Sequence, residues 1–383
     1  MKRMARPMIH ISQPVTGTEE WEALRDPLES GWLTSGPKTR EFEKLFAEKH
    51  QVEHAISTTS ATTALHLSLV ALGIGPGDEV IVPAFTWVAS ANVVLHCGAT
   101  PVFVDIQKET YNIDPVQIHS SISSKTKAII AVHLFGLCAD MDAIAEAAPG
   151  IPIIEDAACA VGASYKNKSA GSLGTLGCFS FHPRKIITTG EGGMITTNDS
   201  ILAETLIQLK NHGATLSEEQ RHHGPKPYLL PVFDSLGYNY RMTDLQGAVG
   251  VAQLKKLDSL LDERKRWAAF YRHELSTIPW LDLPAVANGF SHSWQSYVTF
   301  VNSSKAPYTR NEIMERLLDR GISTRPGTHA VHMLEYYVKK FKYESNDFPI
   351  AKLANDQSVA IPLHNRMSRE DYLWIVDALQ SLN

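Results

Sequence analysis

The chain has 383 residues, of which 44% are hydrophobic and 20% charged, as is typical of a soluble globular protein with a large core. The net charge of -5 comes from interspersed acidic and basic residues, and the absence of a basic stripe excludes nucleic acid as an expected partner. No apolar run approaches the roughly 20 residues that span a bilayer. Residues 1–8 have no apolar run of the secretory type, so we expect a cytoplasmic protein without a membrane segment.

The first half of the chain alternates helical and strand-like patterns. A helical segment places Leu65, Leu69 and Leu72 on one face. Short apolar runs predict strands at 79–82, 101–105, 128–132, 151–155 and 178–181. Because these runs lack polar alternation, they are typical of strands buried on both faces of a mostly parallel sheet. We therefore predict an α/β large domain with its ligands at the carboxyl ends of the strands.

The second half begins with a long helical pattern. From residue 242 the apolar spacing becomes helical, and it continues as a charged amphipathic stretch to residue 275, which we expect to bridge two domains. Beyond it, a strand at 296–301 and a helix at 310–320 are typical of a small α+β domain. We place the boundary near residue 250, which gives a large domain of residues 1–250 and a C-terminal domain of residues 251–383. The four cysteines lack the close spacing of zinc sites, so we predict free thiols, mostly buried, and no metal.

Two residues of the first half are candidates for chemistry. Lys185 lies five residues before a Gly-Glu-Gly-Gly turn, whose glycines allow a close backbone approach. Taken alone, a lysine there is most often a solvated surface charge. Asp156 directly follows the buried run 151–155, where an unpaired carboxylate is costly, so it needs a cationic partner. A structural ion pair or a helix cap explains Asp156 equally well.

Together these motifs resemble the DegT/DnrJ/EryC1/StrS family of sugar aminotransferases, a branch of the fold-type I pyridoxal-phosphate enzymes. The resemblance covers nearly the whole chain through ordered blocks: GWLTSGP, TSATTALHL, PAFTWVASANVVLHCGATPVFVDI, SFHPRKIITTGEGG, GYNYRMTDLQGAVG and GISTRPGTHAVH. It implies a large domain built on a mostly parallel, seven-stranded type of sheet and a smaller α+β C-terminal domain. It also implies pyridoxal 5'-phosphate as the cofactor.

The resemblance assigns roles to the two candidate residues. Lys185 matches the lysine that holds the cofactor as a Schiff base and then acts as the general base. Asp156 matches the carboxylate that keeps the pyridine nitrogen protonated, which the electron-sink chemistry requires. Cys159 stands where many members have a glutamine beside the cofactor hydroxyl. Since a thiol is a weaker hydrogen-bond partner, that contact stays open.

Further family positions imply the rest of the cofactor site. Trp87 matches the aromatic residue that stacks on the ring, although a core tryptophan is the alternative. The start of a helix and a strand-end hydroxyl would bind the phosphate, and these residues are Ser60, Ala61, Thr62 and Ser180. Asn239 matches a residue that reaches the phosphate of the other subunit, which implies a homodimer.

The resemblance also implies the reaction. An amino acid, by family analogy L-glutamate, would give its amino group to a nucleotide-linked keto-deoxy-sugar, and the resulting amino sugar would serve polysaccharide or glycan biosynthesis. The candidates for substrate contacts are His182, Arg184, Arg325 and His329.

Two alternatives remain open. Sugar dehydratases of this fold carry a histidine at the position of Lys185, so the lysine favours transamination. A non-catalytic regulatory relative that only binds the cofactor has no reason to keep Asp156, Ser180, Lys185 and Asn239 together.

Overall fold

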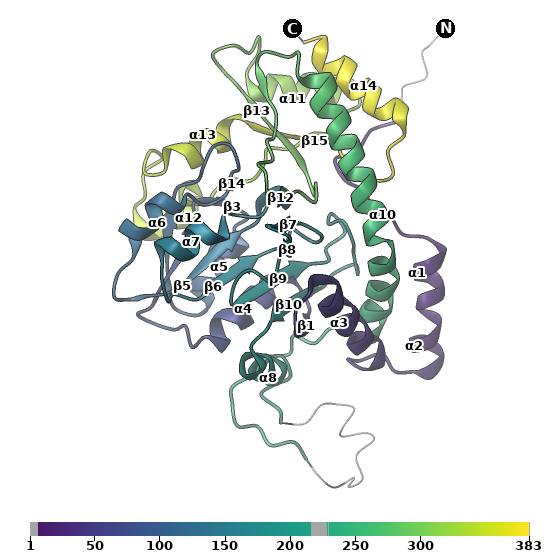
Figure 1. Ribbon diagram of the computed structural model, residues 1–383, viewed down its shortest axis with the longest axis vertical. Coiled ribbons are helices and arrows are strands. Elements are labelled where there is room, and N and C mark those ends of the chain that lie inside the picture. The colour runs from purple at the N-terminus through teal and green to yellow at the C-terminus, as the bar shows by residue number, and fades with distance from the viewer. Residues whose placement is uncertain (1–6, 216–227, 229, 383) are drawn as a thin grey trace.

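The computed structural model describes residues 7–215, 228 and 230–382, and its centre is a seven-stranded sheet (Figure 1). The strands in spatial order are β1 (His54–Thr58), β10 (Gly193–Thr197), β9 (Leu176–Ser180), β6 (Ile153–Asp156), β5 (Thr126–Val132), β2 (Glu79–Pro83) and β4 (Thr100–Val104). Only β10 is antiparallel to its neighbours, so the prediction of a mostly parallel sheet is confirmed. The five predicted strands correspond to β2, β4, β5, β6 and β9.

Helices cover both faces of this sheet, as the unalternating apolar strands require. One face packs under α4 (Ala61–Ala71), α5 (Ala89–His96) and α8 (Ser200–Leu209). The other face packs under α3 (Pro37–His50), α6 (Pro115–Ser121), α7 (Met141–Ala147) and the first half of α10 (Asp244–Leu275). Val80 and Val82 of β2 contribute to the first core and Ile81 to the second, which is the two-residue period of a strand buried on both sides.

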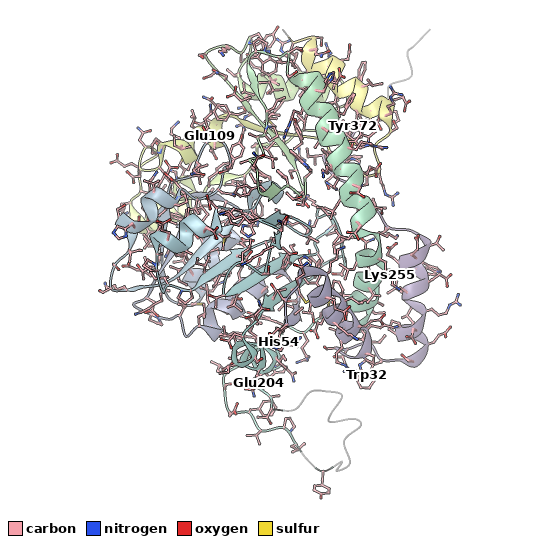
Figure 2. All side chains as sticks on the ribbon, in the orientation of Figure 1. Trp32, His54, Glu109, Glu204, Lys255 and Tyr372 are labelled. Atoms are coloured by element: carbon pink, nitrogen blue, oxygen red, sulfur yellow. The ribbon has the colours of Figure 1, made fainter. Side chains whose placement is uncertain are left out.

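The smaller part of the fold is an α+β unit, as predicted. Its sheet consists of β11 (Leu281–Asp282), β13 (Tyr297–Val301) and β15 (Ser358–Ile361), covered by α11 (Arg310–Asp319), α14 (Arg369–Gln380) and the second half of α10. Tyr372 of α14 lies beside α10 (Figure 2) and stacks on Trp267 with 3.9 Å between the ring centroids. Residue 250, the predicted domain boundary, falls inside α10, which is unbroken over 32 residues. This helix packs against α1 near one end and against α14 near the other (Figure 1).

Part of the C-terminal half lies against the large sheet. The short strand β14 (His329–Ala330) pairs with β3 (Phe85–Thr86), which directly precedes Trp87. Nearby, α13 (Pro349–Gln357) begins on the Asp105 carboxylate at the end of β4, which accepts the N–H groups of Ile350 and Ala351. These contacts carry residues 329–357 to the edge of the sheet where ligands are expected.

The remaining elements are short. They are α1 (Thr18–Ala23), α2 (Arg25–Ser30), α12 (Glu335–Phe341), β7 (Ser164–Tyr165), β8 (Lys168–Ser169) and β12 (Phe290–Ser291). All four cysteines are free thiols, of which Cys138 and Cys178 are buried and Cys97 and Cys159 half-buried. Among the helices of the described residues, none is both long and apolar enough to cross a bilayer.

Candidate active site

Ser180, Asp156 and the start of α4, all predicted to belong to the site, lie at one edge of the large sheet. Thr58, Gly193 and Ser180 lie in one row across β1, β10 and β9, and Asp156 at the end of β6 pairs with Cys178 of β9. Because β1, β9 and β6 all run the same way, their carboxyl ends meet at this edge. The helix α4 begins directly after β1, so its N-terminus lies at the same edge.

Lys185 stands on a turn that follows β9 and is fixed from several sides. Its own N–H donates to the His182 carbonyl at 2.8 Å, and the Thr188 hydroxyl donates to the Phe181 carbonyl at 2.8 Å. The Thr188 N–H is bound by the Gln253 side chain of α10 at 3.1 Å. The Lys185 side chain is half-buried, and its Nζ lies 3.1 Å from the Cys159 Sγ. The thiol therefore contacts the amine that the sequence singles out.

Asp156 is a buried carboxylate without a cationic partner among the residues that the structure describes. Its side chain is 6% exposed. One oxygen accepts the Ser90 hydroxyl at 2.7 Å, and the other accepts the Ala158 N–H at 3.2 Å. Within residues 7–215, 228 and 230–382, no ion pair neutralises it. Since a buried charge needs compensation, this carboxylate fits a group that brings its own positive charge, such as a protonated pyridine nitrogen.

The sequence did not reveal Ser90 as part of the site. This serine lies on the apolar helix α5 and is fully buried, so nothing in its local pattern distinguishes it from a core residue. It becomes significant only through its contact with Asp156, 66 positions away in the chain.

The start of α4 offers free amide groups for an anion. The Ser60 side chain caps the helix by accepting the Thr63 N–H at 3.1 Å. The N–H groups of Ala61 and Thr62 have no partner inside the helix, as in any first helical turn, and they suit a phosphate. A side chain on Gly193 would place its Cβ 2.4 Å from the Ser60 backbone, so a glycine is required for α4 to begin so close to β10.

Trp87 is not a core residue, and it lies beside His329. Its side chain is 60% exposed, which removes the core alternative. The Trp87 and His329 rings meet edge to face with 5.5 Å between their centroids, because β14 pairs with β3. An exposed aromatic face at this edge suits stacking on a flat ring.

The other predicted substrate residues take different positions. The Arg184 side chain is exposed, while its carbonyl accepts the Gln295 side chain at 2.6 Å. His182 is half-buried beside Lys185, and its Nδ1 accepts the Arg184 N–H at 3.2 Å. Burial lowers the pKa of His182, Glu191 opposes this effect, and Lys185 and Arg184 reinforce it, so the ring is neutral at pH 7. Arg325 is exposed and donates to the Thr324 carbonyl at 2.9 Å.

Asn239 is exposed and lies apart from these residues along the chain. Its backbone pairs with that of Asn211, just after α8. In the described part of the chain, no hydrogen bond joins its side chain to Lys185, Asp156 or Ser180.

The assembled groups fit pyridoxal phosphate. They comprise an amine at Lys185, an unneutralised carboxylate at Asp156, a helix N-terminus at Ala61 and an exposed aromatic face at Trp87. These groups supply what the aldehyde, the ring nitrogen, the phosphate and the ring face each require.

Comparisons with known proteins agree with this assignment. A model of the DegT/DnrJ/EryC1/StrS aminotransferase family matches residues 14–380. The chain is 41% identical over 374 residues to the spore coat polysaccharide biosynthesis protein SpsC of Bacillus subtilis (strain 168), covering 97% of this chain and 96% of SpsC. It is 40% identical over 380 residues to the GDP-perosamine synthase of Caulobacter vibrioides, covering 98% of each chain.

A solved structure extends the likeness to three dimensions. Spr1654 of Streptococcus pneumoniae, assigned as a sugar aminotransferase and solved in its PLP form, superposes with a TM-score of 0.90 at 30% identity, covering 98% of each chain. The same protein is also known in its PMP form. These findings confirm the predicted fold and a pyridoxal-phosphate-dependent aminotransferase activity. The chain belongs to the DegT/DnrJ/EryC1/StrS aminotransferase family.

Proposed function

We propose that this aminotransferase moves an amino group from L-glutamate to a nucleotide-linked keto-deoxy-sugar and so makes an amino sugar for polysaccharide or glycan biosynthesis. The observation that carries the proposal is that one edge of the sheet has both an amine, on Lys185, and a buried carboxylate, on Asp156. Among the described residues, no cation neutralises that carboxylate. The likeness to a GDP-perosamine synthase and to a spore coat polysaccharide biosynthesis protein supports the substrate class.

Each residue of the site has a proposed role. Pyridoxal phosphate, when bound, supplies an electron sink for the carbon from which a proton is removed. Lys185 holds the cofactor covalently and, once released, moves the proton between the substrate carbon and the cofactor. Asp156 faces the ring nitrogen, and Ser90 keeps this carboxylate in place through its hydrogen bond. Cys159 contacts Lys185 and thereby limits where the amine can point.

The remaining groups bind and orient. Trp87 covers the ring, and the N-terminus of α4, with Ser60, Ala61 and Thr62, binds the phosphate together with Ser180. The proposed substrate contacts come from His182, Arg184, Arg325 and His329, of which His329 is already in contact with Trp87.

We also propose a homodimer with shared sites. The segment before Asn239 exposes several large apolar side chains, and Tyr228, Leu230, Val232, Phe233 and Leu236 are each more than 60% exposed. A second copy of the chain would cover these side chains and bring its Asn239 towards the neighbouring phosphate. The division into residues 1–250 and 251–383 and the cytoplasmic location also stay predictions.

The test of the proposed function is spectroscopic. Purified protein is mixed with pyridoxal phosphate, and its visible absorption is recorded before and after L-glutamate is added. We expect a visible band that depends on Lys185 and that glutamate bleaches. The protein, whose cofactor now carries the amino group, should then convert a nucleotide-linked keto-sugar to an amino sugar, which is detected by mass spectrometry. A band that glutamate leaves unchanged would refute the donor, and no band would refute the role of Lys185.

A further inference from the structure

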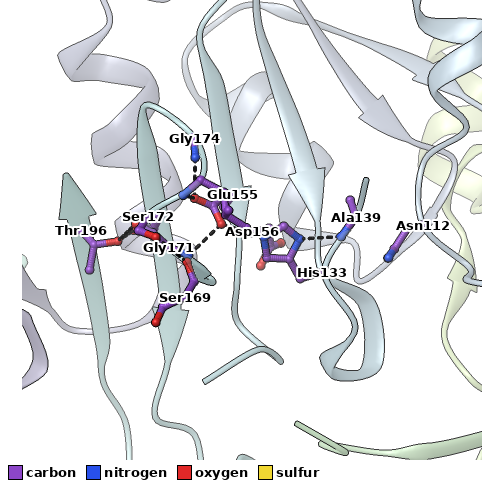
Figure 3. Close-up of polar contacts among 12 residues, drawn as sticks. Asn112, His133, Ala139, Glu155, Asp156, Ser169, Gly171, Ser172, Gly174 and Thr196 are labelled. Carbon is purple, nitrogen blue, oxygen red and sulfur yellow. Dashed lines mark hydrogen bonds and ion pairs between the residues drawn. The ribbon is translucent and has the colours of Figure 1, made fainter. Parts of the chain in front are cut away.

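A second buried carboxylate lies directly beside Asp156 in the sequence. Glu155 of β6 is completely buried, and four N–H groups donate to it (Figure 3). One oxygen accepts the N–H groups of Leu173 and Gly174, each at 2.7 Å. The other oxygen accepts the Gly171 N–H and the His133 Nε2, also each at 2.7 Å. An ionised carboxylate only accepts hydrogen bonds, and this arrangement of four donors matches that form of Glu155.

The histidine in this cluster does not neutralise the charge. The Ala139 N–H donates to the Nδ1 of His133 at 3.0 Å (Figure 3), so this nitrogen carries no proton. The proton of the neutral ring is therefore on Nε2, which donates to Glu155. Within the residues that the structure describes, no lysine or arginine forms an ion pair with Glu155. The pair of Glu155 and His133 thus keeps a full negative charge inside the protein.

The loop that supplies three of the donors is built for this contact. Gly174 lies against β6 so closely that a Cβ on it would be 2.6 Å from the Ile153 carbonyl oxygen. Any side chain at this position would push the loop away from the strand. The glycine therefore allows backbone N–H groups to solvate Glu155, at a place where water does not reach.

Glu155 is also connected to the backbone of Asp156. Successive side chains of a strand point to opposite faces, so the two carboxylates point away from each other. The His133 N–H donates to the Asp156 carbonyl at 3.0 Å, while the His133 ring is held by Glu155 and Ala139. The end of β6, which carries Asp156, is thereby fixed by the residues that bind Glu155.

We propose that Glu155 is a positioning residue for the cofactor: it fixes the strand end that carries Asp156, and its charge, not neutralised by His133, increases the proton affinity of the ring nitrogen that Asp156 faces. The proposal rests on the proposed role of Asp156. It follows that both carboxylates favour the protonated ring nitrogen. Asp156 contacts the ring, whereas Glu155 acts from the opposite face of β6.

The experiment measures the protonation of the ring nitrogen directly. Protein is reconstituted with pyridoxal phosphate labelled with nitrogen-15 in the ring, and the chemical shift of that nitrogen is followed against pH. Asp156→Asn removes the contact charge, so the ring nitrogen should lose its proton at lower pH than in the unmodified protein. Adding Glu155→Gln should lower the midpoint by about one more pH unit, for charges roughly 10 Å apart at an effective dielectric constant of about 20.

Three further double variants separate charge from structure. Glu155→Asp in the Asp156→Asn background retains the charge and should restore the midpoint of Asp156→Asn alone. His133→Lys in that background retains the carboxylate and its backbone donors but neutralises the charge, so it should lower the midpoint even if Glu155→Gln fails to fold. Asp105→Asn, also in the Asp156→Asn background, is the matched control, because Asp105 is a buried carboxylate bound by backbone N–H groups at the start of α13. It should lower the melting temperature without moving the midpoint.

The outcomes distinguish the two levels of the proposal. If Asp156→Asn leaves the nitrogen-15 titration unchanged, the proposed role of Asp156 is wrong. If Asp156→Asn shifts it but neither Glu155→Gln nor His133→Lys shifts it further, the role of Asp156 stands and the inference about Glu155 is refuted. An equal shift from Asp105→Asn would also refute the inference, since general loosening of the fold would then explain the effect.

Discussion

Replacing Ser90 by alanine tests whether the Asp156 carboxylate is preset for its ligand. The Ser90 hydroxyl donates to Asp156 at 2.7 Å, and the Ser90 side chain is fully buried. The substitution removes one oxygen and leaves almost no cavity, so packing changes little. What changes is the orientation of the carboxylate, which retains the Ala158 N–H as a donor, and the contact of the buried Thr86 hydroxyl with Ser90 at 3.0 Å, which is lost.

The magnitude follows from the type of hydrogen bond. A hydrogen bond to a charged group contributes about 1.5–3 kcal/mol. Part of this free energy is lost equally in the cofactor-free protein and does not affect binding. In Ser90→Ala, the Asp156 carboxylate has to be reoriented towards the ring nitrogen when the cofactor binds, and we assign about 1.4 kcal/mol to this step. This free energy corresponds to an approximately tenfold weaker affinity for pyridoxal phosphate.

The assay is a titration of cofactor-free protein with pyridoxal phosphate, followed by the visible band. Ser68→Ala is the matched control, because Ser68 is also fully buried and its hydroxyl donates to the Ala64 carbonyl at 2.9 Å on α4. Unchanged affinity in Ser90→Ala, or an equal loss in Ser68→Ala, would show that Ser90 has no specific effect on Asp156.

Three other substitutions test separate steps of the reasoning. Lys185→Ala should retain the fold, bind the cofactor without a covalent bond and lose turnover by at least about 10²-fold; substantial activity in that variant would contradict the central assignment. The Asn239→Ala protein and the Lys185→Ala protein should each be inactive alone, but a mixed dimer with one subunit of each kind should be active. One of its two sites then has Lys185 from one subunit and Asn239 from the other; no recovery would mean that Asn239 does not act across the interface. Burial lowers the pKa of His50 to about 4 from 6.5. Between pH 6.5 and 4, the histidine is protonated in the unfolded chain but neutral in the folded protein. The free energy of unfolding therefore falls by about 3 kcal/mol as the pH drops from 6.5 to 4. His50→Gln should reduce this dependence of the free energy of unfolding on pH, measured by urea unfolding. An unchanged slope would show that His50 does not cause the acid sensitivity.

The sequence predicted the parts of the fold that depend on local patterns. The predicted run 79–82 lies within β2 (Glu79–Pro83), and the run 128–132 lies within β5 (Thr126–Val132). These runs were recognisable because strands buried on both faces of a sheet are typically rich in consecutive Val and Ile. No prediction was made for β1 and β10, whose sequences HAIST and GMITT mix polar and apolar residues. Their burial comes from neighbours that lie far away in the chain.

The site was predicted residue by residue, but not its assembly. The motif around Lys185 and the strand end at Asp156 are local signals. The contact between His329 and Trp87 depends on the pairing of β14 with β3, which joins segments more than 200 residues apart. No periodicity in either segment indicates that pairing. Ser90 illustrates the same limit, since a serine inside an apolar helix has no local signal of function.

Glu155 and Asp156 show where local reasoning ends. Both are carboxylates at the end of the same buried strand, and the sequence gives each the same reason to need a partner. The structure separates them: a glycine-containing loop and a neutral histidine give four donors to Glu155, while Asp156 has a hydroxyl and one amide. A carboxylate solvated by its own protein is structurally complete, and one that lacks compensation retains free energy for a cationic ligand. Which of two adjacent carboxylates is left available for a cationic ligand is therefore decided by the donors that the fold brings to each. These donors come from His133 just after β5, from α5, from the 171–174 loop and from Ala158 just after β6.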